Sequence, residues 1–111
     1  MKLSDVKGER TLDVLADLIG PIATLAEDDK VKRLFTRESA PEGMTAREFG
    51  TKKIKELMPA LIKDHKAELI EILATLEGTD PKAYAKGLTL AKLTKDVLEL
   101  VGDEEFVAFF S

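Results

Sequence analysis

Cysteine and tryptophan are both absent from this 111-residue chain. Without cysteine the fold has no disulfides, no thiolate metal sites and no cysteine nucleophile, and the absence fits a reducing cytoplasm. Aromatic residues are also scarce, with one Tyr and five Phe. A β-sandwich or β-barrel would need many more aromatic and β-branched positions, so this composition argues against both.

Long hydrophobic runs are missing as well. The opening residues Met1–Asp5 include no apolar core of signal-peptide length, and no later stretch is long enough to span a membrane. The net charge of −4 disfavours a nucleic-acid binder, because sequence-independent affinity for nucleic acid depends on a surplus of Lys and Arg. We therefore expect a cytoplasmic protein that contacts neither membrane nor nucleic acid.

The residues that are plentiful favour helix. Hydrophobic residues make up 44% of the chain and charged residues 34%, and Leu, Ala, Lys and Glu carry much of the sequence. All four are good helix formers, and the length suffices for one core. The sequence predicts an all-α fold: residues 1–111 form a compact single-domain bundle of six to eight helices, several of them short, with proline and glycine breaks.

The first helix is predicted from Glu9 to about Ile19. Its apolar residues recur every three or four positions, which places them on one predicted face: Leu12, Leu15, Leu18, Ile22 and Leu25. Pro21 follows Gly20 within this pattern. Because proline lacks an amide hydrogen and clashes with the preceding turn, we expect a break or a sharp kink there, with Pro21 opening a second short helix.

Local signals predict the boundaries of the central helices. Residues 36–44 have no periodicity and form the predicted loop, which ends at a capping box between Thr45 and Glu48. Pro59 is expected to bend or restart the next helix, and Asp64 to cap the one after it. That helix carries a broad apolar stripe ending at Leu76, which predicts the most central position in the bundle.

Three further signals divide the carboxyl-terminal third. Gly78 supplies a left-handed helix stop, and Asp80 followed by Pro81 is a specific helix start. A longer helix is predicted from Leu88 to about Val101. After it, Asp103 caps a final turn or two.

Candidate catalytic residues are few. His65 is the only histidine, and beside Asp64 it would need partners from elsewhere to act as a base or metal ligand. The acidic runs at 27–29 and 103–105 lack the spacing of a calcium loop and favour helix capping instead. No phosphate-binding or dinucleotide-binding glycine motif is present. We therefore expect no enzyme activity, no metal and no cofactor.

Lysines are concentrated in the middle of the chain. They are Lys52, Lys53, Lys55, Lys63 and Lys66, with Glu56, Asp64 and Glu68 interleaved. Such mixing is typical of a solvated, salt-bridged face. A small helical DNA-binding or regulatory protein remains the alternative function, and it would require these lysines to converge on one face.

The carboxyl end is unusually aromatic for a chain terminus. Phe106, Phe109 and Phe110 lie among the last six residues. They can pack on the protein's own core, or they can form a partner-binding surface, with Phe35 and Met44 as a second group beside the predicted loop. If they bind a partner, truncation after Asp103 should impair binding more than secondary structure.

Several segments together carry a resemblance to a known family. They are the opening Met1–Glu9, the stretch Asp13–Ile22, the lysine-rich central helices and the turn at 78–81. In these segments and in its length, the chain resembles a tail assembly chaperone of long-tailed (siphovirus-type) bacteriophages or prophages of Gram-positive bacteria. The resemblance covers most of the chain but includes no catalytic signature.

The resemblance implies a non-enzymatic function in the host cytoplasm. Chaperones of this family bind the long tape-measure protein, keep its apolar helices soluble and recruit major tail proteins to it. The implied partners are therefore the tape-measure and major tail proteins, with self-association as a further contact. The family supplies no functional-residue motif, so the resemblance assigns no individual residue.

Overall fold

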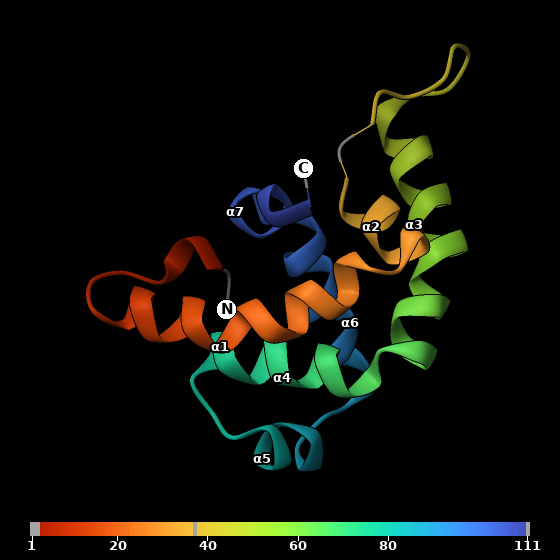
Figure 1. Cartoon of the computed structure of the whole chain (residues 1–111). Coiled ribbons are helices and arrows are strands. Elements are labelled where there is room, and N and C mark those ends of the chain that lie inside the picture. The colour runs from red at the N-terminus through yellow and green to blue at the C-terminus, as the bar shows by residue number, and fades with distance from the viewer. Residues whose placement is uncertain (1–2, 37, 111) are drawn as a thin grey trace.

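The computed structural model describes residues 3–36 and 38–110, with the side chain of Ser4 left out. Over these residues the chain forms seven α-helices, two short 3₁₀ turns and no strand, which confirms the predicted all-α bundle of six to eight helices (Figure 1). The elements are η1 (Leu3–Asp5), α1 (Arg10–Ala26), α2 (Asp29–Phe35), α3 (Ala46–Asp64), α4 (Lys66–Glu77), α5 (Pro81–Lys86), α6 (Leu90–Gly102), α7 (Glu104–Val107) and η2 (Ala108–Phe110).

Helix α4 is the centre of the packing, as its broad apolar stripe predicts. It lies beside α1 and also contacts α3 and α5 (Figure 1). Every α-helix contributes buried apolar side chains to the core, among them Leu18, Leu25, Val31, Phe35, Leu57, Leu61, Leu69, Ile72, Leu76, Tyr84, Val97, Leu100, Phe106 and Val107. The structure therefore has one shared apolar core.

Helix α1 continues through Pro21, so the prediction that the helix breaks here and a second one begins is wrong. Pro21 is itself buried, between the buried side chains of Leu18 and Ile22. The hydroxyl of Thr24 donates to the carbonyl oxygen of Gly20 at 3.3 Å. Packing on both sides of the proline outweighs the one helical hydrogen bond that it removes, since each buried aliphatic side chain contributes about 1.5–3 kcal/mol.

Helix α3 likewise passes through Pro59 without restarting. Leu57 and Leu61 are buried on either side of it, so core contacts hold this helix together too. The predicted cap at Asp64 is wrong, because Asp64 is the last residue of α3. His65 separates α3 from α4, and its side chain makes no capping hydrogen bond.

The other local signals are confirmed. Thr45 and Glu48 form both hydrogen bonds of the capping box, and no helix occurs at the described positions of the predicted loop. Asp80 accepts from two amides at the start of α5. The buried carboxylate of Asp103 accepts from the amide of Glu105 and also from that of Leu3, which ties the first turn of the chain to α7.

Gly78 ends α4 in the left-handed conformation, with φ of +81°. A side chain there would be strained, and its Cβ would lie 3.2 Å from the guanidinium of Arg10. Arg10 occupies this place because its Nη2 donates to the carbonyl oxygens of Thr75 and Leu76, each at 3.3 Å. The first residue of α1 thus satisfies carbonyls at the end of α4.

Candidate functional site

Three of the five residues predicted as a partner surface are core residues. Phe35, Phe106 and Phe110 are almost completely buried and pack against one another. The rings of Phe35 and Phe106 meet edge to face with centroids 5.1 Å apart, and those of Phe35 and Phe110 stack at 4.9 Å. Burial of three large rings is worth several kcal/mol, so the terminal segment docks on its own fold. Of the two alternatives for these three residues, the structure shows packing on the protein's own core and not an exposed partner surface.

Phe109 and Met44 are the two remaining members of the predicted surface. Phe109 is 41% exposed, and Met44 is half-buried. The loop before α3, which includes Met44, is well separated from α7 and the turn that follows it (Figure 1). The two residues therefore do not form one surface, and binding by either of them stays a prediction.

A different apolar surface lies on α1. Leu12 is 72% exposed, Ile19 58% and Leu15 37%. The spacing of three and then four residues places them on one face of the helix, which we call the α1 stripe. Leu18 and Leu25, by contrast, point into the core. The sequence analysis predicted one buried face for Leu12, Leu15, Leu18, Ile22 and Leu25. The apolar arc of α1 is in fact wider than the core covers, and the edge that includes Leu12 and Leu15 stays exposed.

A groove lined by carboxylates lies on the other side of α1 from the α1 stripe, across the buried face of the helix. It lies between α1 and α4 and has a volume of about 510 Å³. Its charged residues are Asp13 and Asp17 from α1, Glu71 from α4, and Arg10. Three negative charges against one positive make this groove acidic, and we call it the acidic groove.

A second, smaller pocket lies between α2 and α3. Its volume is about 230 Å³, and its lining is largely apolar: Leu34, Phe35, Ala46, Phe49, Ile54, Val101 and Val107, with Thr36, Glu38, Gly50 and Lys53. Lys53 is buried there, donates to the carbonyl oxygen of Thr36 and lies 3.9 Å from the carboxylate of Glu38. Lys53 is thus turned inward, which removes it from the basic face that DNA binding would require.

His65 pairs with Asp28, which is distant in sequence. The Nε2 atom of His65 lies 2.8 Å from Oδ2 of Asp28, and the pair joins the start of α2 to the junction of α3 and α4. The hydrogen bond from His65 is the main cause that lowers the pKa of Asp28 below its ordinary value of 3.8. Asp28 also caps α2 by accepting from the amide of Lys30. The sequence predicted helix capping by the acidic run at 27–29 but not the pairing with histidine.

This pair gives a pH-dependent prediction. A carboxylate with a lowered pKa stabilises the fold above its unfolded pKa of 3.8, and the contribution is lost as the pH falls through the lower folded value. The substitution Asp28→Asn keeps the helix cap but weakens the contact with His65. We expect its melting temperature to lie below that of the unaltered chain near neutral pH, with the difference shrinking below pH 3.8. The exposed neighbour Asp29→Asn is the control, and an equal pH profile for both variants would contradict the prediction.

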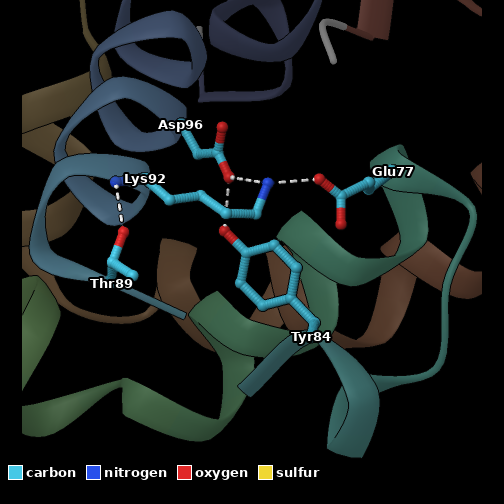
Figure 2. Close-up of polar contacts among 5 residues, drawn as sticks. All are labelled: Glu77, Tyr84, Thr89, Lys92 and Asp96. Carbon is cyan, nitrogen blue, oxygen red and sulfur yellow. Dashed lines mark hydrogen bonds and ion pairs between the residues drawn. The ribbon is translucent and has the colours of Figure 1, made fainter. Parts of the chain in front are cut away.

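A partly buried polar network joins α4, α5 and α6 (Figure 2), with Tyr84 and Asp96 buried. The hydroxyl of Tyr84 donates to Oδ2 of Asp96 at 2.6 Å, and the ammonium of Lys92 lies 3.3 Å from the same oxygen and donates to Glu77. Burial and then the bond to Asp96 raise the pKa of Tyr84 above its ordinary value of 10.0. Every polar group drawn has a partner, which indicates a structural network.

The described residues include no group of His, Asp and Glu side chains that could hold a metal ion. None of the described helices is both long and apolar enough to cross a membrane. No protein-family model, curated protein or solved structure matches the chain. Its function therefore has to be inferred from its own surface and sequence.

Proposed function

We propose that this protein is a non-enzymatic phage tail assembly chaperone or adaptor, which binds the tape-measure protein and recruits tail subunits during tail morphogenesis. The sequence resemblance suggests this function, and the α1 stripe is the observation that carries it. The stripe offers three large aliphatic side chains to a partner without any rearrangement of the core.

The exposure of the α1 stripe has an energetic consequence. Full burial of a Leu or Ile side chain is worth about 1.5–3 kcal/mol, so covering the stripe favours association with another apolar surface. Amphipathic helices commonly bind through residues spaced by three and four positions. A long tape-measure protein built from such helices would present many equivalent faces, which several copies of this small protein could cover.

Co-expression with the tape-measure protein of the same genome tests the proposal. We expect the two proteins to co-purify, and the tape-measure protein to precipitate when it is expressed alone. The double substitution Leu12→Ser and Ile19→Ser should weaken binding by about 2–4 kcal/mol, roughly 30- to 1,000-fold in Kd. Isothermal titration calorimetry with a soluble tape-measure fragment measures this change.

Helix α6 supplies the matched control. Leu90 and Leu98 are also exposed, so Leu90→Ser with Leu98→Ser removes a similar apolar area from another helix. We expect this variant to bind the fragment as the unaltered chain does. Equal losses in both double variants, or no binding by the unaltered chain, would contradict the proposal.

A further inference from the structure

We infer that the pocket between α2 and α3, which we call the α2–α3 pocket, binds a small apolar carboxylate of about the size of benzoate. The carboxylate of this ligand would pair with Lys53, and its apolar body would fill the pocket. The site is separate from the proposed function, which uses the α1 stripe. Three features support it: an apolar wall, a buried ammonium, and a carboxylate of the chain itself beside that ammonium.

Most of the pocket wall is apolar. Leu34 and Phe35 of α2 and Val107 of α7 are buried, and the half-buried Phe49 and Ile54 line the pocket from α3. The volume is about 230 Å³. An apolar cavity of about 150 Å³ is enough to bind benzene, so the larger volume here accommodates a benzene ring with one further small group.

Gly50 leaves space on the α3 side of the pocket. It lines the pocket from within α3, and a Cβ atom built on it would meet no packed neighbour within 4 Å. Glycine weakens a helix interior relative to alanine, and no crowding requires it at this position. The space beside Gly50 is therefore available to a ligand, and a larger side chain at this position would fill it.

Lys53 supplies the positive charge of the pocket. Only 9% of its surface is exposed, and its ammonium donates to the carbonyl oxygen of Thr36, which also lines the pocket. A buried charge is costly unless an opposite charge and hydrogen bonds compensate for it. A ligand carboxylate that accepts from this ammonium would thus be held firmly, because charge-assisted hydrogen bonds are stronger than neutral ones.

Glu38 shows where such a carboxylate can lie. Its Oε1 atom is 3.9 Å from Nζ of Lys53 and 3.5 Å from Nε of Arg33. A charge-assisted hydrogen bond is about 2.7–2.9 Å long, so Glu38 is only loosely paired with Lys53. Residues 38–40 belong to no helix, and Arg33 is exposed. A ligand can therefore take the place of Glu38 beside Lys53 while Glu38 turns to water near Arg33.

The charges of the site select among ligands of this size. A cation would be repelled by Lys53 and Arg33, and a neutral molecule would make no ion pair with either. An inorganic anion could pair with Lys53 but would leave the apolar wall uncovered. A molecule with both a carboxylate and an apolar body uses both parts of the pocket.

Benzoate, benzamide and benzylamine are the probes for the experiment, since they share a ring and differ in charge. Each is titrated into the isotope-labelled full chain, and binding is followed by the NMR shifts of the backbone amides. We expect benzoate to bind with a Kd of about 0.1–1 mM, which is ordinary for so small a ligand. Benzamide and benzylamine should bind about tenfold more weakly, because they lack the charged pair. The shifts should centre on Gly50, Lys53 and Ile54.

Substitutions of the two charged residues test the pairing. Lys53→Met keeps an unbranched apolar stem, and we expect it to weaken binding of benzoate about tenfold and to remove the preference over benzamide. Glu38→Gln removes the competing charge, and we expect it to tighten binding of benzoate about two- to fivefold. A purely structural ion pair between Lys53 and Glu38 predicts no such gain.

A third substitution tests the cavity. Gly50→Leu should weaken binding of benzoate about tenfold or more, because the new side chain fills the space that the ring would cover. This variant should fold, since leucine is a better helix former than glycine. Gly102→Leu is the matched control, because a Cβ atom at Gly102 also meets no neighbour within 4 Å but the residue does not line the pocket. We expect this control to bind benzoate as the unaltered chain does.

Several results would overturn the inference. They are no binding of benzoate, equal binding of benzoate and benzamide, weaker binding in Glu38→Gln, unchanged binding in Gly50→Leu, and tighter binding of a peptide that ends in a free leucine carboxylate. Shifts centred on Leu12 and Ile19 would place benzoate on the α1 stripe and would equally contradict it. If Lys53→Met does not fold, Glu38→Gln and Gly50→Leu still decide. Failure of the tape-measure protein to bind would leave this pocket unaffected.

Discussion

Replacement of Phe106 by alanine is expected to lower the free energy of unfolding by about 3–5 kcal/mol. Phe106 is fully buried, and its ring contacts those of Phe35 and Phe110, with centroids 5.1 and 5.6 Å away. Removal of the ring loses both its transfer free energy and its aromatic contacts, and it leaves a cavity that the two neighbours only partly fill. Since domains of this size are stable by about 5–15 kcal/mol, the variant should be close to unfolding.

Urea denaturation followed by circular dichroism measures this loss. Phe109→Ala is the matched control, because Phe109 lies three residues away in the same segment but is 41% exposed, whereas Phe106 is fully buried. We expect this control to cost about 1 kcal/mol or less. If the two substitutions lower the free energy of unfolding equally, the terminal segment does not pack as described. By the same reasoning, truncation after Asp103 should unfold the chain, whereas the partner-surface hypothesis predicted that secondary structure would be largely retained.

The second large effect is expected at Asp96. The substitution Asp96→Ala removes the acceptor of the buried Tyr84 hydroxyl and one of the two carboxylates beside Lys92. A hydrogen bond to a charged group contributes about 1.5–3 kcal/mol, and an unsatisfied buried hydroxyl adds a penalty. We therefore expect a loss of about 2–3 kcal/mol in the free energy of unfolding.

A double-mutant cycle with Tyr84→Phe separates the pair from its surroundings. Tyr84→Phe alone should lower the free energy of unfolding by about 1–2 kcal/mol. The double variant should lower it by clearly less than the sum of the losses in the two single variants. Additive losses would contradict the pairing. Because the pKa of Tyr84 is raised, its stabilising contribution should be complete below pH 10 and fall as the pH rises further.

Features fixed by neighbours in sequence could be predicted. The capping box at Thr45, the left-handed Gly78 and the caps at Asp80 and Asp103 depend on hydrogen bonds that span two to four residues. Such bonds form within each segment whatever the rest of the chain does. The fold class followed from the same local preferences, summed over the chain.

The predictions that were wrong depended on tertiary packing. Pro21 is a local helix breaker, yet it lies inside α1 because residues before and after it are buried by other helices. Apolar residues cover more than half the circumference of α1, so periodicity alone could not say which face the core would take. This excess of apolar positions could have predicted the α1 stripe, since a helix that is covered on one side needs apolar residues on that side only.

Contacts between distant residues had no local signal at all. His65 and Asp28 are 37 positions apart, and Glu71 joins Asp13 and Asp17 only because α4 packs along α1. Composition left open whether the terminal phenylalanines pack in the core or form an interface. Their burial was decided by Phe35, which supplies the ring against which the other two pack.

The Tyr84 network has a practical consequence for optical work. Tyr84 is the only tyrosine and the chain has no tryptophan, so near-ultraviolet emission of the protein comes almost entirely from one ring. That ring lies between α4, α5 and α6, and its hydroxyl donates a hydrogen bond to one carboxylate, that of Asp96. A tryptophan carried on a ligand would therefore accept excitation energy from one defined donor, the ring of Tyr84, without any label on the protein.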